Sequence, residues 1–528
     1  MQRVPLLMAA LLAVSCGSQT PSPSRSAQPN TPSASARPTP DRETPVANGR
    51  PDLISLEHGE AVTEEMRTLN SDDYADPPNQ FRTGHTTPRA LPKEALSTTK
   101  GGFSIQLPSK APIVTPAVYD GMVITSGGFH SKEIYAFDAK SGALEWGLNL
   151  DDDGPSAPAC EDDVCVFNTE SCTVFAVEAK SGELLWSWWL GDPLMSAPTI
   201  ANGMVYTAFP AQGNTNGVRA QQQHATSAPR PPGMSHALGA FDLQTGEMKW
   251  SLWIDADVMS APVATRDALF VTTFAGTVMK LDPTDGSILQ ARRDRATSAP
   301  VIADGSLYYS RRDDGDDGVN EALVRSSATK GSYVTARKKA DYLDEKVQSK
   351  SKMAERGRSL DASNGFSGGA PASANAQTAN ALVGQASVST LQAFQGSRAL
   401  NFRGLNVNSM GDEVVCTRAD SGEELWRLQL DGDLANSGGF LAAPPVAAGG
   451  QLFVATLQGE VLQLDPDSGK VAKRHRVGRA VRSQPVVENG WLYVGTDDGQ
   501  LVALRLGDDR FTGWSHWGGN AARTGVAR

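Results

Sequence analysis

The chain has 528 residues, of which 40% are hydrophobic and 20% are charged, a composition typical of a soluble globular protein. Its formal net charge of -11 disfavours nucleic acid and anionic membrane surfaces as primary partners. The length alone suggests several domains, but an internal repeat in the second part of the chain predicts one large ring instead.

Residues 1–16 have the parts of a secretory signal peptide, because the basic Arg3 precedes an apolar run at 4–14. This run is too short to span a bilayer as a permanent helix. The sequence LAVSC, which ends at Cys16, resembles the lipobox of bacterial lipoproteins, in which the cysteine is lipidated and becomes the new N-terminus. The Gly-Ser pair that follows resembles that of lipoproteins sent to the outer membrane. The alternative is a plain signal peptide that contains a cysteine.

Two segments of unusual composition follow. Residues 17–50 are rich in Ser, Pro, Thr and Ala and have few large apolar side chains, so they cannot bury enough surface to fold. We expect a disordered tether there, and a flexible chain of this length spans roughly 30 Å. Residues 51–100 are polar and ambiguous, and we expect a loosely attached lead-in segment.

Residues 101–528 repeat one unit. The stretch AFDAKSGALEW from Ala136 recurs as AVEAKSGELLW from Ala176 and as AFDLQTGEMKW from Ala240, and fainter copies begin at positions 280, 325, 416, 463 and 503. Each copy has the pattern of a strand, a turn with Gly at a fixed offset, and a second strand. A β-hairpin precedes each copy, as at Asn489-Gly490, a strong two-residue turn signal. Four strands in each of eight units predict an all-β, eight-bladed β-propeller.

The repeat also assigns structural roles to single residues. The Gly of each copy is expected to adopt a positive φ angle, which other residues adopt at a cost. The sequence GFSIQL at 102–107 is expected to complete the last blade and close the ring, with Phe103 in the tryptophan position. Trp514 and Trp517 are expected to pack against that blade. Four tryptophans occupy one position of the repeat and are expected to pack between neighbouring blades: Trp146, Trp186, Trp250 and Trp426.

Four cysteines remain after the lipobox. Alignment of the second blade on the first places Asp162 and Asp163 at a hairpin turn, so that Cys160 and Cys165 face each other across two strands. Directly opposed residues have Cα atoms close enough for a disulfide, and we predict that bond. The other two, Cys172 and Cys416, are expected to be unpaired, and the spacing of the four fits no zinc module.

Two insertions interrupt the period, at about 212–235 and at about 333–395. The first is rich in Gln, Gly and Pro and predicts an exposed loop. The second begins with a basic, helix-prone stretch and continues in Ala, Ser, Gly, Asn and Gln. It predicts a solvated helix followed by disorder, and the alternative is an arm that binds a partner.

Catalytic and metal-binding motifs are missing from the pattern. An acidic cluster at 313–317 suggests calcium, but its Gly spacing fails the EF-hand pattern, which favours a solvated turn. The seven histidines form no HExxH motif, and the sequence has no GxSxG elbow and no P-loop. We therefore predict no metal site and no catalytic residue.

The AFDAKSGALEW units, together with SAPTIANGMVYTAF from Ser196, resemble the repeats of the pyrroloquinoline-quinone-like (PQQ-like) β-propeller superfamily over about 101–513. That resemblance implies one of two branches. One branch comprises quinone-dependent dehydrogenases, in which the alcohol dehydrogenases stack the quinone on a disulfide between adjacent cysteines with calcium close by. The other comprises non-enzymatic lipoproteins such as the BamB-like subunit of the outer-membrane β-barrel assembly machine.

This chain has no Cys-Cys pair and no CxxCH haem motif, which favours the lipoprotein branch. We therefore expect a protein-binding scaffold without a cofactor, tethered by lipid to the outer membrane and facing the periplasm. Its partners would be envelope proteins, including an outer-membrane β-barrel complex, which would meet its faces and exposed strand edges. The alternatives are a PQQ-dependent periplasmic dehydrogenase and, from fold analogy alone, a polysaccharide-binding propeller.

Overall fold

The computed structural model describes residues 54–71, 73, 83–169, 173–190, 196–210, 231–315, 318–339, 399–433, 437 and 440–525. Contacts divide the chain into two units, Met1–Thr44 and Pro45–Arg528, and every described residue belongs to the second. The predicted signal peptide with Cys16 and the predicted tether at 17–50 therefore lie outside the described residues. Within those residues, no helix is both long enough and apolar enough to cross a bilayer.

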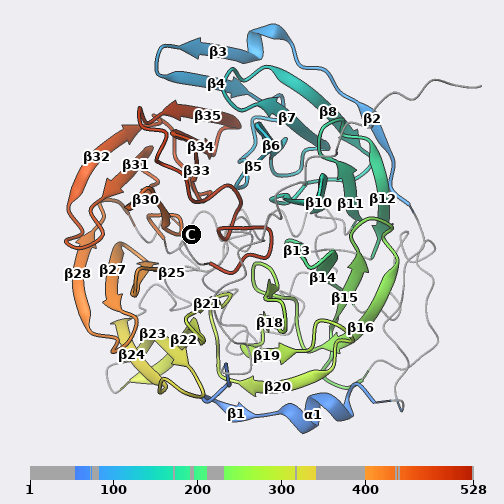
Figure 1. The fold of residues 1–528 in the computed structure, drawn as a ribbon, viewed down its shortest axis with the longest axis vertical. Coiled ribbons are helices and arrows are strands. Elements are labelled where there is room, and N and C mark those ends of the chain that lie inside the picture. The colour runs from blue at the N-terminus through green and yellow to red at the C-terminus, as the bar shows by residue number, and fades with distance from the viewer. Residues whose placement is uncertain are drawn as a thin grey trace, which may run out of the picture. The chain divides into compact units, whose positions relative to one another are not determined.

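The second unit is a ring of eight antiparallel sheets, which confirms the predicted eight-bladed propeller (Figure 1). Blade 1 contains β5 (Ala117–Tyr119), β6 (Met122–Ser126), β7 (Glu133–Asp138) and β8 (Leu144–Leu150). Blade 2 contains β9 (Ala159–Glu161), β10 (Val164–Asn168), β11 (Thr173–Glu178) and β12 (Leu184–Trp189). Blade 3 contains β13 (Thr199–Ala201), β14 (Met204–Pro210), β15 (His236–Asp242) and β16 (Met248–Ile254). Blade 4 contains β17 (Val263–Ala264), β18 (Leu269–Thr272), β19 (Thr277–Leu281) and β20 (Ile288–Arg293).

The remaining blades follow the same order, from an innermost strand at the centre to an outermost strand at the rim. Blade 5 contains β21 (Val301–Ala303), β22 (Ser306–Gly315), β23 (Gly318–Ser326) and β24 (Tyr333–Lys339). Blade 6 contains β25 (Ala399–Phe402), β26 (Leu405–Met410), β27 (Glu413–Arg418) and β28 (Glu424–Gln429). Blade 7 contains β29 (Val446–Ala448), β30 (Gln451–Ala455), β31 (Glu460–Leu464) and β32 (Val471–Arg476). Blade 8 contains β33 (Val486–Glu488), β34 (Trp491–Gly495), β35 (Gln500–Arg505) and β4 (Gly102–Gln106).

Blade 8 closes the ring as the sequence predicted. Strand β4 comes from the beginning of the repeat region and pairs antiparallel with β35, so that Phe103 lies opposite Ala503. A methyl group on Gly142 of blade 1 would lie 2.7 Å from the Phe103 ring. Phe103 thus packs against the next blade, in the position that tryptophan holds elsewhere, and the first and last blades are held together by segments far apart in sequence.

The repeated turn between the third and fourth strands of a blade is held by a short polar motif. In blade 1, the Asp138 carboxylate accepts hydrogen bonds from the Ser141 amide at 2.7 Å and from its hydroxyl at 2.6 Å. These bonds, the hydroxyl first, lower the pKa of Asp138. The next residue, Gly142, has a φ of 74°, and the seven repeated glycines lie between 67° and 78°, as predicted. Polar caps and glycine together specify the turn.

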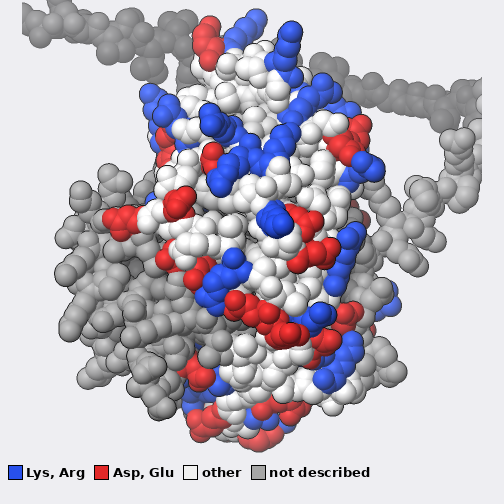
Figure 2. Space-filling model, turned by 90° about the vertical axis from the view of Figure 1, so that its left-hand side faces the viewer, with Lys and Arg blue, Asp and Glu red and all other residues white. Residues whose placement is uncertain are grey.

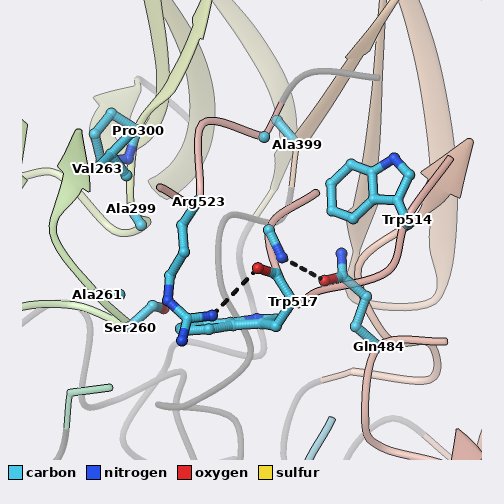
Figure 3. A pocket seen from close by; sticks show the side chains of 12 residues that line it. Ser260, Ala261, Val263, Ala299, Pro300, Ala399, Gln484, Trp514, Trp517 and Arg523 are labelled. Carbon is cyan, nitrogen blue, oxygen red and sulfur yellow. Dashed lines mark hydrogen bonds between the residues drawn. The ribbon is translucent and has the colours of Figure 1, made fainter. Parts of the chain in front are cut away.

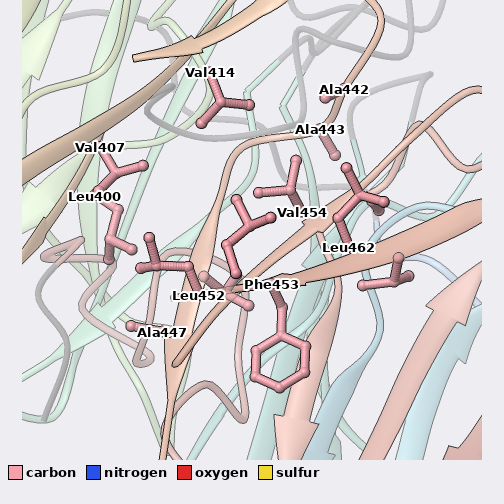
Figure 4. Close-up of a cluster of buried hydrophobic side chains, with 14 of the residues drawn as sticks. Leu400, Val407, Val414, Ala442, Ala443, Ala447, Leu452, Phe453, Val454 and Leu462 are labelled. Atoms are coloured by element: carbon pink, nitrogen blue, oxygen red, sulfur yellow. The ribbon is translucent and has the colours of Figure 1, made fainter. Parts of the chain in front are cut away.

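The core consists of apolar residues that alternate along each strand and fill the space between neighbouring blades. The largest cluster joins blades 6, 7 and 8 and includes Val407, Leu452, Phe453, Val454 and Leu462 (Figure 4). All five are at most 3% exposed. Because similar clusters lie between other blades, the ring is one continuous packed body.

The N-terminal arm, which we define as the described part of residues 54–99, is not the loosely attached lead-in that the sequence predicted. It contains β1 (Glu60–Ala61), α1 (Thr63–Thr68), β2 (Thr86–Pro88), a 3-10 turn at Lys93–Ala95 and β3 (Leu96–Thr99). Strand β1 adds to β20, β2 adds to β8, and β3 adds to β4, each antiparallel and each as a fifth, outermost strand. Strands this short have no periodic pattern, so their polar sequence gave no sign of pairing.

Both predicted insertions leave and re-enter the ring at one face. Strands alternate in direction within a blade, so the end of β14, the start of β15, the end of β24 and the start of β25 all lie on the same side. The second insertion begins later than predicted, because Tyr333–Lys339 forms β24, the fourth strand of blade 5, rather than the start of a helix. The rest of the predicted helix and most of the first insertion, residues 211–230, lie outside the described residues.

Candidate functional site

The four predicted tryptophans lie between blades, each against the repeated glycine of the next blade. A methyl group on Gly182 of blade 2 would lie 2.8 Å from the Trp146 indole of blade 1. The indole N–H of Trp146 also donates to the Ala179 carbonyl at 2.9 Å. The same bond joins three further pairs, Trp186 to Leu243, Trp250 to Pro283 and Trp426 to Pro466, at 2.7 to 2.9 Å. These side chains are therefore structural contacts between neighbouring blades.

The structure brings the two predicted cysteines together. Cys160 and Cys165 are register partners in β9 and β10, with Cα atoms 4.1 Å apart, and their sulfur atoms are bonded. The turn between them is made by Asp162 and Asp163, whose φ angles are 49° and 62°. The bond therefore closes a hairpin at the inner end of blade 2. Cys416 is buried in blade 6 and carries a thiol, and Cys172 lies outside the described residues.

The centre of the ring is occupied by the end of the chain, as the red ribbon in Figure 1 shows. We call residues 511–525 the C-terminal plug. Its carbonyls accept hydrogen bonds from innermost strands of five blades at 2.6 to 3.1 Å, from the amides of Val118, Ile200, Ala264, Ile302 and Val487. Three further contacts come from blade 2 at Ala157, blade 6 at Asn401 and blade 7 at Gly449. The plug therefore touches all eight blades and pairs the inner edges that an open channel would expose.

Two plug residues fill the middle of the ring (Figure 3). The Trp517 ring is 1% exposed and packs with residues of four blades, so it does not lie on the last blade alone as predicted, whereas Trp514 bridges to Val487 of that blade. The Arg523 guanidinium stacks on Trp517, 3.9 Å from the ring centroid. It donates to the carbonyls of Pro198, Trp517 and Ala157 at 3.0, 3.2 and 3.4 Å. Burial lowers the pKa of Arg523 well below its usual value.

The space left beside these residues does not fit a quinone cofactor. The pocket lined by Ser260, Gln484, Trp514, Trp517 and Arg523 has room for about one water molecule. No group of three or more acidic, His or Cys side chains in the described residues is arranged to hold a metal ion. Of the predicted acidic turn, Asp313 lies at the end of β22 and pairs with Arg311 at 3.3 Å, whereas Asp316 and Asp317 lie outside the described residues.

The outer rim, meaning the outermost strand of each blade, divides into a covered part and an uncovered part. Besides the pairings of β1, β2 and β3, Asn70 of the arm binds both the amide and the carbonyl of Trp253 in blade 3, at 2.7 and 3.1 Å. Gly84 of the arm binds the Ser187 hydroxyl of blade 2 at 2.8 Å. The arm thus covers the rims of blades 4, 3, 2, 1 and 8 in turn. Among the described residues, β24, β28 and β32 remain the outer edges of blades 5, 6 and 7.

The arm also replaces a missing tryptophan. The tryptophan position of blade 4 is Gln290, whose side chain accepts a hydrogen bond from the Leu56 amide at 2.9 Å. Ile54 and Leu56 are each 1% exposed and fill the boundary between blades 4 and 5. Sequence reasoning missed both the arm and the plug. The signal that could have found the arm is the absence of a large aromatic residue at position 290.

Comparison with known proteins identifies a protein family and one relative that this chain resembles in sequence. A family model described as outer membrane protein assembly factor BamB matches residues 130–225, 232–398 and 410–523, more than half of the chain. Outer membrane protein assembly factor BamB of Alkalilimnicola ehrlichii is 38% identical over 72 residues, which are 13% of this chain and 19% of that protein. The sequence match thus spans about a fifth of that relative's length.

Solved structures share the fold. The crystal structure of BamB from Moraxella catarrhalis covers 78% of this chain and 99% of its own, with a TM-score of 0.50 and 16% identity. Saccharomyces cerevisiae Sqt1 covers 75% of this chain and 96% of its own, with a TM-score of 0.50 and 11% identity. At these sequence identities, the two structures show a shared fold alone.

Proposed function

This chain belongs to the protein family described as outer membrane protein assembly factor BamB, and from that premise we propose that it is a protein-binding scaffold of the bacterial envelope. It works on the periplasmic side of the outer membrane, in the assembly of outer-membrane proteins. Its partners are envelope proteins, among them a β-barrel assembly complex. It acts by binding and positioning and not by catalysis.

One observation carries this proposal beyond the family match. The C-terminal plug joins all eight blades and leaves room for about one water molecule beside Arg523. A propeller enzyme needs a cavity of several hundred Å³ for a drug-sized ligand. Because the centre of this propeller is filled, binding would take place on its faces and its rim, which are large enough to contact other proteins.

Attachment to the membrane is part of the proposal. Cys16 is the lipidated residue, and residues 17–50 are the tether that lets the propeller stand off the lipid surface. Metabolic labelling with palmitate tests this step directly. The wild-type chain is expected to take up label and to fractionate with outer membranes, and Cys16→Ser is expected to do neither. A soluble, unlabelled wild-type protein would contradict the anchor without touching the scaffold role.

The scaffold role is tested by affinity capture of the full-length protein from detergent-solubilised envelopes. A β-barrel assembly protein is expected to co-purify in near-stoichiometric yield. A second variant replaces residues 340–398 with a linker as long as the connection from β16 to β17, because a deletion from 333 would remove β24. Loss of capture in that variant would place the contact on the second insertion.

The result that would overturn the proposal is equally concrete. The purified protein would capture no envelope protein and would reduce a dye when pyrroloquinoline quinone and calcium are added. The matched control for dye reduction is Trp517→Ala, which opens the plug. An enzyme with a central cofactor would lose activity in this variant, whereas background reduction would be unchanged.

A further inference from the structure

We propose that the outer edge of β32 in blade 7 is a docking edge, where an extended acidic segment of another protein pairs as a fifth strand. The inference rests on the proposed scaffold function and names its surface and the chemistry of its partner. It starts from the arm, which adds a strand to three of the eight rims and forms hydrogen bonds with two more. The outer rim of this propeller is therefore built to accept added strands, and blades 5, 6 and 7 keep uncovered edges among the described residues.

The backbone of β32 presents its hydrogen-bonding groups outward at defined positions. The amide of Val477 donates inward to the Gly459 carbonyl at 2.9 Å. Because consecutive residues of a strand point their amides to opposite sides, the amides of Arg476 and Arg474 point away from β31. The same alternation holds on a covered rim, where the outward amide of Trp253 in β16 is bonded by the arm. An incoming strand would use Arg474 and Arg476 in the same way.

The charge of this edge selects an acidic partner. Strand β32 reads VAKRHR, and Lys473, Arg474 and Arg476 are all exposed, in a protein whose net charge is -11. Arg474 is paired with Glu460 at 2.8 Å, but Lys473 and Arg476 have no ion-pair partner among the described residues. Figure 2 views this side of the rim, where Lys and Arg side chains are interspersed with Asp and Glu side chains.

The neighbouring edge in blade 6 is different. Arg427 of β28 is bound on both sides, by Glu413 at 2.6 Å and by Glu424 at 2.7 Å, so its charge is already neutralised. Basic residues on an edge repel a second basic edge, which disfavours pairing of β32 with its own copy. A strand that carries Asp or Glu would turn that repulsion into attraction. The uncompensated charge therefore distinguishes blade 7 from blade 6.

The edge is also rigid, which lowers the entropic cost of docking. The His475 side chain of β32 is buried, with 6% of its surface exposed, and its ring shares a hydrogen bond with the Gln463 side chain at 3.0 Å. Its ring lies 6.2 Å, centroid to centroid, from the ring of Phe453, which belongs to the largest apolar cluster of the ring (Figure 4). The strand is thus fixed from one side while its other edge stays open.

The test uses two synthetic probes, an eight-residue peptide of alternating Val and Glu and its twin of alternating Val and Lys, titrated into the full-length protein by fluorescence anisotropy. The acidic probe is expected to bind saturably and more weakly as salt rises, and the basic probe is not. Arg476→Pro removes the outward amide but breaks no hydrogen bond between β32 and β31, because this amide points away from β31. It should weaken binding at least about tenfold. Arg476→Gln keeps the amide, removes the same charge, and should weaken binding several-fold less.

Gln429→Pro is the matched control, because the inward amide of Leu430, bonded to Asp412 at 2.7 Å, places the amide of Gln429 outward on the edge of blade 6. It should leave binding unchanged. Near-ultraviolet circular dichroism confirms that each variant is folded. Equal binding by Arg476→Pro and Arg476→Gln would overturn strand pairing, and so would binding to phosphatidylglycerol vesicles that both variants weaken equally. Envelope capture at wild-type yield by Arg476→Pro would overturn the docking edge and leave the scaffold function standing.

Discussion

The contact between each tryptophan and the glycine of the next blade is an interlock that a double-mutant cycle at Trp186 and Gly246 can measure. A methyl group on Gly246 would lie 2.6 Å from Cδ2 and 2.7 Å from Cγ of Trp186, closer than real carbon atoms approach. Gly246→Ala should therefore cost about 1–2 kcal/mol for its positive φ and about 1–3 kcal/mol more for overpacking. Trp186→Ala should cost about 3–5 kcal/mol.

The matched control is Gly331→Ala, at the same position of the repeat in blade 5. Its φ is 78°, near the 70° of Gly246, but no atom lies within 4 Å of the added methyl group. Gly331→Ala should therefore show the backbone penalty alone, about 1–2 kcal/mol. In the Trp186→Ala background, the cost of Gly246→Ala should fall to this value, because the indole that it strikes is gone.

The free energy of unfolding of the four proteins and the control, from urea denaturation followed by tryptophan fluorescence and circular dichroism, gives the coupling energy. The expected coupling is about 1–3 kcal/mol, with the double mutant more stable than the sum of the single costs. If Gly246→Ala costs the same with and without the indole, the interlock is not a packing contact and the interpretation of all four tryptophans is wrong.

Three further predictions concern stability. Burial, and then the nearby positive charge of Lys473, lower the pKa of His475 from 6.5 to about 4. As pH falls, the unfolded chain therefore binds the proton first, and the free energy of unfolding should decline by up to about 3 kcal/mol between pH 6.5 and 4. The variant His475→Gln should remove that part of the decline, measured as the melting temperature at each pH. The Cys160–Cys165 bond closes a loop with a sequence separation of 5, so replacement of both by alanine should cost about 2 kcal/mol, and dithiothreitol should lower the melting temperature of the wild type alone. Trp517→Ala should cost about 3–5 kcal/mol by calorimetry, whereas a cost under about 1 kcal/mol would mean that the centre is not packed.

Local patterns explain why so much of the ring could be predicted. Each turn is specified within a few residues, since Asp138, Ser141 and Gly142 form their hydrogen bonds and their φ without help from other blades. The strand GFSIQL could be assigned to the last blade because the ring needs a fourth strand there, and Phe103 fits the tryptophan position. Repetition multiplies these weak signals, because eight copies of one short motif exclude accidental matches.

The candidate surfaces were harder to predict, because they depend on contacts between distant segments. Strand β1 has two residues, and Asn70 mimics a strand with its side chain, so neither leaves a periodic pattern. The basic stretch that begins at residue 336 predicts a helix, but residues 336–339 pair with β23 and form the end of strand β24. The edge of β32 can be identified as uncovered only from the path of the arm around the other blades.

The amino-acid pattern was sufficient to specify the blade, the number of blades and the way the ring closes, because these follow from short-range turn chemistry and from alternating apolar residues. Packing in three dimensions decided which edges are covered, what fills the centre, and where uncompensated charge remains. Those features arise when segments hundreds of residues apart bind backbone groups that the blades leave unpaired, as the plug does at Val118 and Ile302 and the arm does at Trp253. No local pattern encodes these long-range contacts, and they decide that β24, β28 and β32 stay outermost among the described residues.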